Sequence, residues 1–329
     1  MATAEQVRAL VKSHSEGDDA RFMSIAMQVA ASEAKKGNSD FAAELRTLID
    51  RAREKSLRPA GIPIPFSTPQ GELRDLLSSS NPELRLDDMV LPEEVRLRLE
   101  RILEEQREMA LLKGHNLRPK QRLLLVGPPG CGKTMTAGVL AGELGLPLFV
   151  VRLDGLVTKF MGETGAKLRL IFDAMERTRA VYLFDEFDSI GLERGSGQDV
   201  GEMRRVLNSF LMMLEHYHGS SIVIAATNHG HALDTALFRR FDDVIEFTAP
   251  TKKLIAQAIK RRLTTVPAAK TKLPYDKLAA EADGLSYAEV VRACDDALKE
   301  MLLRRRSTLS AQDLSRVLQE RLAFSKRRP

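Results

Sequence analysis

The chain has 329 residues, of which 43% are hydrophobic and 29% are charged, a composition typical of a soluble globular protein with two or three domains. No apolar run approaches the roughly 20 residues of a membrane-spanning helix, and the N-terminus lacks a secretory signal, so we expect neither a membrane protein nor a secreted one. Two cysteines, Cys131 and Cys294, give no disulfide framework and indicate a cytoplasmic protein. The net charge of +5 permits contact with nucleic acid or with acidic partners without favouring either.

The N-terminal part of the chain differs in composition from the rest. Residues 1–57 carry apolar side chains at helical spacing with two breaks, which predicts a small bundle of three short helices that we interpret as a recruitment module. Proline, glycine and serine then crowd residues 58–83, as is typical of a linker. A folded irregular segment is the alternative, because Ile62, Ile64 and Phe66 are apolar enough to dock on a core.

Strands and helices alternate over residues 84–250. A helix is expected over Pro92–Leu112. Five apolar runs then predict strands at Leu123–Val126, Leu148–Arg152, Val181–Phe184, Ile222–Ala226 and Val244–Phe247. Helical patterns lie between them, at Met135–Leu144, Lys167–Glu176 and Glu202–Tyr217. This alternation predicts an α/β domain of three layers, in which a parallel sheet lies between two layers of helices.

No strand is evident after Pro250. Apolar residues at helical spacing predict four helices, Leu254–Leu263, Tyr275–Glu281, Tyr287–Leu303 and Ala311–Leu322. Residues 251–329 are therefore expected to form an all-helical lid on the α/β domain.

The most informative stretch is GPPGCGKT, which fits the phosphate-loop pattern G-x-x-x-x-G-K-[ST] between a predicted strand and a predicted helix. Its glycines let backbone N–H groups turn toward a phosphate, and the helix N-terminus adds partial positive charge. The alternative is an ordinary Gly-Pro turn before a helix. Residues expected to bind the nucleotide here are Gly127, Pro128, Pro129, Gly130, Cys131, Gly132, Lys133, Thr134 and Met135. Lys133 is expected to reach the β- and γ-phosphates, and the Thr134 hydroxyl to ligate Mg²⁺.

Two later strands end in polar residues. The strand Val181–Phe184 is followed by Asp185 and Glu186, and ligands of parallel sheets bind at the carboxyl ends of strands. Asp185 is therefore expected to hold Mg²⁺, and Glu186 to activate the attacking water. The alternative is a pair of solvated acids. Asn228 ends the next strand, where it is either a water-positioning amide or a turn residue.

Arg239 and Arg240 are adjacent in the run Leu233–Asp242. They are either basic residues at a helix C-terminus, where the helix dipole favours them, or arginine fingers that act on the nucleotide of a neighbouring protomer. The residues alone leave both possibilities open.

Together these motifs resemble those of the AAA family of ATPases in order and approximate spacing, from Asp87 to about Leu303. The resemblance implies binding of ATP and Mg²⁺, ATP hydrolysis, and a single homo-oligomeric ring, expected to be a hexamer. It implies that Asn228 senses the γ-phosphate and that Arg239 and Arg240 act in trans. The arginines are adjacent here, as in the microtubule-severing and endosomal-sorting relatives, so which of them is the finger stays open.

The resemblance also implies contacts to the adenine and to a substrate. Met89 and Val90 resemble the segment that meets the base from one side, and Tyr287 and Ala288 lie in a motif that meets it from the other, with Tyr287 where a glycine is usual. That tyrosine argues against a close backbone approach.

Three consecutive residues, Lys159, Phe160 and Met161, resemble the central pore loop that grips a threaded polypeptide; packing of Phe160 and Met161 in the core is the alternative. Residues 194–199 resemble a second loop deeper in the same pore, and their glycines suit mobility.

We therefore expect an ATP-hydrolysing motor that remodels, unfolds or threads a protein, and that could serve a separate protease or effector. The N-terminal helices would recruit the substrate or a partner protein. One alternative is a DNA-acting ATPase, a loader or a transposition helper, which the mild basic charge permits. Another is a nucleotide-gated adaptor that barely hydrolyses ATP, against which the intact Lys133 and Glu186 argue.

Overall fold

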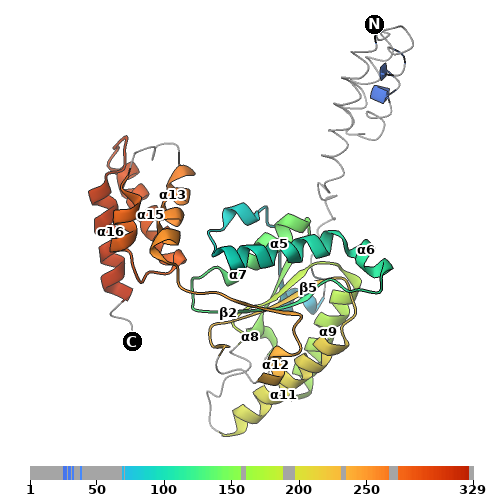
Figure 1. Ribbon diagram of the computed structural model, residues 1–329. Helices are drawn as coiled ribbons and strands as arrows, with labels where there is room; N and C mark the ends of the chain where they lie inside the picture. The colour runs from blue at the N-terminus through green and yellow to red at the C-terminus, as the bar shows by residue number, and fades with distance from the viewer. Residues whose placement is uncertain are drawn as a thin grey trace. The chain divides into compact units, whose positions relative to one another are not determined.

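Figure 1 shows the computed structural model of the chain. The structure describes residues 71–156, 161–187, 197–230, 235–266 and 273–325, together with residues 25–27, 29, 30, 32, 38 and 69. The chain divides into two units, Met1–Ile62 and Pro63–Pro329, and each is considered by itself. Within the first unit, the described residues before 38 are helical, and Ala26, Val29 and Ala30 are buried. The rest of the predicted N-terminal bundle lies outside the described residues.

The second unit is built on a six-stranded sheet with the strand order β1-β3-β4-β5-β2-β6. The strands are β1 (Leu77–Ser80), β2 (Arg122–Val126), β3 (Leu148–Val151), β4 (Val181–Phe184), β5 (Ile222–Thr227) and β6 (Asp243–Glu246). Strands β2 to β6 pair in parallel, as the sequence predicted, whereas β1 pairs antiparallel with β3 at the edge.

The edge strand β1 and the short helix α4 (Leu73–Leu76) lie within residues 58–83, where the sequence predicted a linker. The prediction of a linker missed both elements. Leu76 and Leu77 are buried in the apolar cluster beside the sheet, and the backbone of Leu77–Ser80 pairs with β3. Burial of two leucines and a ladder of backbone hydrogen bonds orders a segment whose serines alone indicate a loop.

Helices cover both faces of the sheet (Figure 1). Helices α5 (Glu93–Arg107) and α7 (Lys133–Leu144) lie on one face, and α9 (Met161–Arg177) and α11 (Gly197–His216) lie on the other. Successive strand residues alternate between the two apolar clusters: Leu123 and Leu125 pack with α5 and α7, and Leu124 packs with α9 and α11. Strands β2 to β5 consist mainly of consecutive apolar residues because both of their faces are buried. The predicted three-layer α/β fold is confirmed.

Several boundaries differ from the sequence prediction. The helix expected over Pro92–Leu112 is two helices, α5 and α6 (Met109–Gly114), which meet at Glu108. Three short elements had no signal in the sequence: η1 (Leu86–Asp88), α8 (Leu153–Leu156) and α12 (Thr235–Phe238). Elements of three or four residues are too short to show a helical period.

The C-terminal lid is helical, as predicted. It consists of α13 (Lys252–Thr264), α14 (Tyr275–Glu281), α15 (Tyr287–Leu303) and α16 (Ala311–Ser325), which share one apolar cluster. Ser286 caps α15: its hydroxyl accepts from the Glu289 backbone N–H, and the Glu289 carboxylate accepts from the Ser286 N–H in return.

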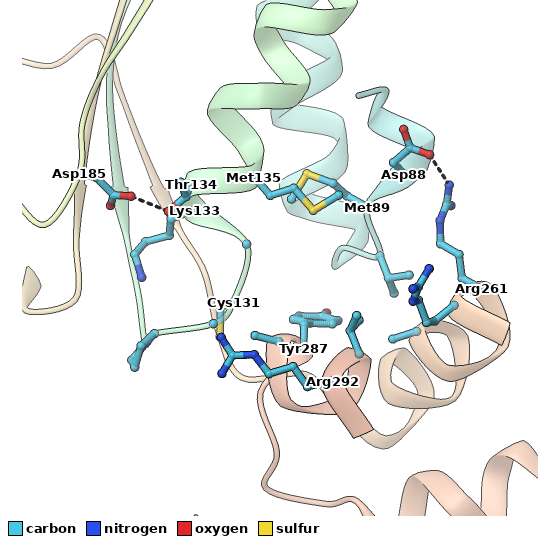
Figure 2. Close-up of a pocket in the computed structure, with 18 of the residues that line it drawn as sticks. Asp88, Met89, Cys131, Lys133, Thr134, Met135, Asp185, Arg261, Tyr287 and Arg292 are labelled. Atoms are coloured by element: carbon cyan, nitrogen blue, oxygen red, sulfur yellow. Dashed lines mark hydrogen bonds and ion pairs between the residues drawn. The ribbon is translucent and has the colours of Figure 1, made fainter. Parts of the chain in front are cut away.

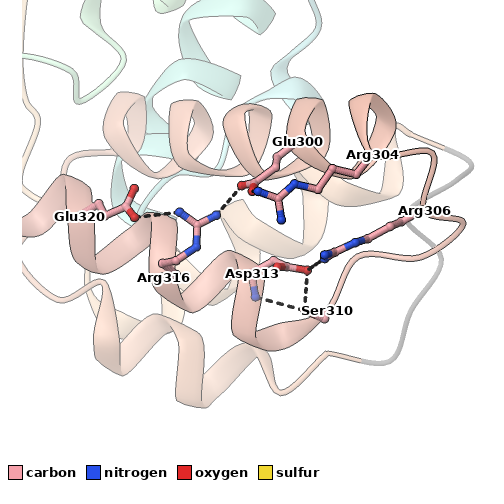
Figure 3. A network of polar contacts seen from close by, with 7 residues as sticks. All are labelled: Glu300, Arg304, Arg306, Ser310, Asp313, Arg316 and Glu320. Carbon is pink, nitrogen blue, oxygen red and sulfur yellow. Dashed lines mark hydrogen bonds and ion pairs between the residues drawn. The ribbon is translucent and has the colours of Figure 1, made fainter.

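Charged pairs cover the outer surface of α15 and α16 (Figure 3). Glu300 accepts from both Arg304 and Arg316, and across the turn between the helices Arg306 contacts Asp313 at 3.0 Å. The arginines of these pairs are about half exposed and the carboxylates less so, and pairs this open to solvent add little stability, so the apolar cluster beneath them accounts for most of the stability of the lid. In the described part of the chain, no helix combines the length and the apolar character that crossing a membrane requires.

Candidate functional site

The glycines of the phosphate loop have backbone conformations that only glycine adopts without strain. Gly127, Gly130 and Gly132 have φ angles of 149°, 75° and 102°. A Cβ atom on Gly127 would lie 2.2 Å from the carbonyl oxygen of Phe247, and one on Gly130 would lie 2.7 Å from Ser286 Oγ. The loop therefore turns sharply after β2 and packs directly against Phe247, the residue after β6, on one side and against the lid on the other.

Lys133 begins α7 and is 6% exposed. Its ammonium group donates to the carbonyl oxygens of Gly127 at 2.6 Å and Pro128 at 2.9 Å, and to Asn228 Oδ1 at 2.8 Å. Two carbonyl oxygens of the phosphate loop therefore contact the Lys133 ammonium group on one side, and the side-chain amide of Asn228, just after β5, contacts it on another. The fold thus brings together Lys133 and Asn228, which are 95 residues apart in the chain.

Thr134 and Asp185 are in direct contact. The Thr134 hydroxyl donates to Asp185 Oδ2 at 2.6 Å (Figure 2). The contact forms because β4, β5 and β2 are neighbours in the sheet, so the carboxyl end of β4 lies beside the start of α7. A hydroxyl and a carboxylate oxygen at one point are the hard oxygen donors that Mg²⁺ prefers.

Glu186 has a left-handed backbone, with φ of 50°, although it is not a glycine. Its N–H donates to Asp185 Oδ1 at 3.0 Å, and the next residue, Phe187, is anchored by an N–H bond of 2.8 Å to the carbonyl of Ala226. A non-glycine residue in this conformation costs about 1–3 kcal/mol, and such strain concentrates at functional sites. The side chain of Glu186 is exposed and lines the cavity described next.

A cavity of about 690 Å³ lies between the phosphate loop and the lid, within the size range of small-molecule sites (Figure 2). The α/β domain lines it with Asp88, Met89, Val90, Pro129, Gly130, Cys131, Gly132, Lys133, Thr134, Met135, Asp185, Glu186 and Asn228. The lid lines it with Ala258, Arg261, Arg262, Thr265, Tyr287, Ala288, Val291 and Arg292. Most of the residues predicted from the sequence to bind nucleotide, metal or water therefore surround one cavity.

Two polar contacts across this cavity tie the lid to the α/β domain. The N–H of Ala288 donates to the carbonyl of Gly130 at 3.1 Å, and Arg261 donates to Asp88 at 3.1 Å. The first contact is a close backbone approach, against which Tyr287 had argued. It is possible because the missing side chain is on Gly130, where a Cβ would be 3.1 Å from the Cβ of Ala288.

Tyr287 lines the cavity, but its hydroxyl is buried and makes no hydrogen bond with any residue that the structure describes. Burial, and to a smaller extent the neighbouring Cys131, raises the pKa of Tyr287 to about 12. Burial likewise raises the pKa of the Cys131 thiol, against the opposing effect of Lys133. Both side chains are therefore neutral at physiological pH, and this part of the cavity lining carries no charge.

Some predicted residues lie outside the cavity. Gly127 and Pro128 do not line it, although their carbonyls hold Lys133. Arg239 is exposed, and Arg240 lies 3.7 Å from Glu215 of α11; neither lines the cavity of its own chain.

The predicted pore loops fall largely outside the part of the chain that the structure describes. Lys159 and Phe160 lie outside it, as do positions 194–196 of the second loop. Met161 is the first residue of α9, and α11 begins at Gly197.

Sequence reasoning missed Arg261, Arg262 and Arg292. The first two are basic residues in the last turn of α13, and the third lies on the second turn of α15. For the first two the only signal was spacing: Ala258, Arg261 and Arg262 of α13, with Thr265 just after it, lie on one helical face. Nothing in the sequence says that this face meets the phosphate loop.

Comparison with known proteins agrees with the geometry. Residues 123–249 match the family described as ATPase family associated with various cellular activities (AAA). The chain is 35% identical over 329 residues to the uncharacterized AAA family ATPase y4kL of Sinorhizobium fredii. The alignment covers 97% of this chain and 96% of that protein. The chain therefore belongs to the AAA family of ATPases, and its activity is the hydrolysis of ATP.

Other relatives are longer. The chain is 30% identical over 264 residues to the ATP-dependent zinc metalloprotease FtsH 3 of Sphaerobacter thermophilus, with 79% of this chain and 54% of that protein covered. It is 32% identical over 260 residues to a katanin p60-like ATPase of Homo sapiens, with 76% and 52% covered. The chain thus spans about half the length of each of these two relatives.

Proposed function

We propose that this ATPase is a protein-remodelling motor that works as a ring, expected to be a hexamer, and binds ATP with Mg²⁺ in the cavity between the phosphate loop and the lid. The observation that carries the proposal is the convergence of Lys133, Thr134, Asp185 and Glu186, from separate segments of the chain, on this one cavity. These four side chains supply the cation, the metal ligands and the base that phosphoryl transfer to water requires.

The donor set fits Mg²⁺. Thr134 and Asp185 offer two hard oxygens, and the described residues contain no cluster of three or more histidine, cysteine or acidic side chains that would form an all-protein metal cage. Mg²⁺ is usually held by one or two protein ligands together with substrate phosphates and water. When bound, it would neutralise charge on the β- and γ-phosphates.

The roles of the residues follow from their chemistry. Lys133 and the loop N–H groups hold the phosphates, and Asn228 positions the γ-phosphate and water. The Glu186 carboxylate accepts a proton from water, whose oxygen attacks the γ-phosphorus in line with the bond to the β-phosphate oxygen. That bond breaks, and the products are ADP and inorganic phosphate.

Arg239 and Arg240 act on the nucleotide of a neighbouring protomer. Arg239 is exposed, and neither arginine lines the cavity of its own chain, which supports action in trans. A guanidinium delivered from the adjacent protomer stabilises the charge of the transition state and makes turnover depend on assembly.

We propose that the substrate is a protein. One relative is named an ATP-dependent zinc metalloprotease, and a protease acts on proteins. Lys159, Phe160 and Met161 would form the loop that grips this substrate. Residues 1–57 would recruit the client, and residues 251–329 form the lid on the ATPase domain of residues 84–250. The free thiols of Cys131 and Cys294 support a cytoplasmic location.

The test of assembly-dependent chemistry is turnover by the double variant Arg239→Ala/Arg240→Ala across a range of protein concentrations. We expect ATP turnover to fall by about 10³-fold or more while ATP binding persists. In the unaltered chain, turnover per protomer should fall on dilution as rings dissociate. The matched control is Arg177→Ala, which removes an exposed arginine from the end of α9. A double variant as active as the control would overturn the proposal.

The client test uses Glu186→Gln, which should bind ATP without turning it over and so hold its client. Protein retained with this variant in ATP, but not in ADP, is identified by mass spectrometry. Stimulation of the ATPase of the unaltered chain by unfolded protein rather than by single- or double-stranded DNA is expected. Stimulation by DNA alone would contradict a protein substrate and favour the DNA-acting alternative.

A further inference from the structure

The segment formed by residues 82–90, called the wall segment below, lies along helix α7. Its first residues contact α7 at Gly142, near the end of that helix. Its last three residues, Asp88, Met89 and Val90, line the cavity beside the start of the same helix. One helix therefore carries the phosphate loop at its N-terminus and supports a second wall of the cavity along its length.

Two glycines of α7 let the backbone of the wall segment lie directly on the helix. A Cβ atom on Gly142 would be 2.2 Å from the carbonyl oxygen of Leu84 and 2.9 Å from that of Pro82. One on Gly138 would be 3.0 Å from Leu84 Cδ1. Glycine inside a helix destabilises it relative to alanine, so these positions favour close contact with the wall segment over helix propensity.

Two polar contacts fix the position of the wall segment along α7. The N–H of Leu86 donates to Glu143 Oε1 at 3.0 Å, and the Arg85 guanidinium donates to the carbonyl oxygen of Gly142 at 2.8 Å. The other carboxylate oxygen of Glu143 accepts from Arg107 of α5 at 2.8 Å. Loss of the Glu143 carboxylate would leave the partly buried Leu86 N–H without its acceptor, which costs more than the hydrogen bond itself contributes.

The contact at Leu86 reaches the cavity through one short turn. The N–H of Met89 donates to the carbonyl oxygen of Leu86 at 3.1 Å, so the two residues move together. Met89 is 6% exposed, and its sulfur accepts from the Thr136 hydroxyl at 3.8 Å. A Cβ on Gly132 of the phosphate loop would be 3.0 Å from Met89 Cε. A shift of Leu86 on α7 would therefore change how Met89 sits against the phosphate loop.

We propose that Glu143 is a positioning residue for the nucleobase: it holds the wall segment on α7 and thereby sets the distance between Met89 and the phosphate loop. The inference rests on the proposed function, because it takes ATP to occupy the cavity with its base against Met89 and Val90. Glu143 itself lies outside the cavity lining and acts through Leu86. Affinity for the base then depends on a residue that the nucleotide does not touch.

The test compares Glu143→Ala with its parent in a Glu186→Gln background, where turnover does not interfere. A fluorescent ATP analogue labelled on the ribose is displaced by ATP, by adenosine and by inorganic tripolyphosphate, of which only the last lacks the base. We expect the affinities for ATP and adenosine to fall about fivefold or more, and the affinity for tripolyphosphate to stay within about twofold. Glu143→Gln should recover most of the loss, because its amide oxygen still accepts from the Leu86 N–H.

Arg107→Ala is the matched control, because it removes the ion pair between Glu143 and α5 and keeps the contact with Leu86. It should change each of the three affinities by about twofold or less. The inference would be overturned by a loss in Arg107→Ala as large as that in Glu143→Ala. No loss for ATP in Glu143→Ala, or an equal loss for all three ligands, would overturn it as well.

Hydrogen exchange in the Glu186→Gln parent tests the same coupling without a change in the wall segment or in α7, and it decides the matter if melting temperatures show that Glu143→Ala is unfolded. Amides of residues 84–90 should exchange about fivefold or more slowly with adenosine bound, and at an unchanged rate with tripolyphosphate bound. Equal protection by the two ligands would contradict the inference.

Failure of the proposed function would look different from failure of this inference. Lys133→Ala should abolish binding of ATP and of tripolyphosphate, because it removes the cation of the phosphate loop. If Lys133→Ala bound both as tightly as its parent, the polyphosphate would not occupy this cavity and the proposed function would fail. If Lys133→Ala were defective and Glu143→Ala bound ATP normally, the site would stand and the positioning role of Glu143 would be wrong.

Discussion

The α/β domain and the lid contribute to the same cavity in different ways. The α/β domain buries its strands between two apolar clusters, and two cavity residues for which we propose a role in hydrolysis, Asp185 and Asn228, directly follow such strands. The lid has one apolar cluster under a surface of partly exposed ion pairs, and it supplies arginines from helix faces. The proposed catalytic groups therefore follow buried strands, whereas the lid reaches the cavity with side chains from helix faces.

Two polar contacts between the two regions lie at the cavity itself. The Ala288 to Gly130 hydrogen bond and the Arg261 to Asp88 pair both join residues that line it. A ligand in the cavity would therefore strengthen the junction between the regions, because it touches both sides. The comparison predicts large effects on chemistry from the α/β domain and effects on binding from the lid.

The largest expected effect is on turnover. Glu186→Gln removes the carboxylate that we propose accepts the proton of the attacking water but keeps the size of the side chain. ATP turnover should fall by about 10²–10⁴-fold with ATP affinity little changed, measured by phosphate release and by equilibrium binding. The lid variant Arg292→Ala should show the opposite pattern, weaker binding with a smaller loss of maximal turnover. If turnover survived Glu186→Gln, another group would be the base, and the expected contrast between the α/β domain and the lid would fail.

The next effect is on stability. Phe210 of α11 is fully buried, and its ring centroid lies 4.7 Å from that of Phe184 and 4.9 Å from that of Phe187, the residues that flank Asp185 and Glu186. Phe210→Ala should lower the free energy of unfolding by about 3–5 kcal/mol, because it leaves a cavity in the core.

Urea unfolding followed by circular dichroism measures this loss. The matched control on the same helix, Met212→Ala, changes a side chain that is 52% exposed and should cost about 0.5 kcal/mol or less. In the lid, Ile259→Ala removes a fully buried side chain and should shift a separate unfolding transition if the two regions unfold independently. A single transition shifted equally by both core variants would show that the regions form one cooperative unit.

The smallest expected effect depends on pH. Burial alone would raise the pKa of Asp242, but hydrogen bonds from the Arg122 side chain and from the N–H groups of Gln121 and Arg122 outweigh it and hold the pKa below its usual range. Because the pKa is depressed in the folded state, the carboxylate stabilises the protein above the pKa of the unfolded chain, about 4, and this stability is lost as pH falls through the folded value.

Asp242→Asn should therefore cost about 1–3 kcal/mol at pH 7 and progressively less below about pH 4. Urea unfolding at a series of pH values measures the difference. Asp283→Asn in the lid, whose carboxylate is 54% exposed and 3.3 Å from Lys252, is the matched control and should change little at any pH. A pH-independent loss in Asp242→Asn would mean that its shape, and not its charge, matters.

The parts of the site that could be predicted from the sequence are those whose residues lie next to one another in the chain. The run Gly127–Thr134 contains the turn, the lysine and the hydroxyl of a phosphate loop within eight consecutive residues. Asp185 follows a short apolar strand, so it lies at the carboxyl end of a parallel sheet whatever the position of that strand in the sheet. Strands β2 to β5 were likewise visible because each consists mainly of consecutive apolar residues, and β6 was visible from Val244, Ile245 and the following Phe247. Strand β1 was not, since three of its four residues are exposed serines.

What the sequence by itself determined is the phosphate loop, the acidic strand end and the three-layer α/β class with a helical C-terminal part, because local spacing encodes each of them. What only the tertiary structure decided is which face of the lid meets that loop. Arg292 and Tyr287 line the cavity because α15 docks through Ala288 on Gly130, a glycine far earlier in the chain. Helical periodicity identifies an apolar face but not its neighbour, so the polar residues beside that face acquire a role only when the helices pack.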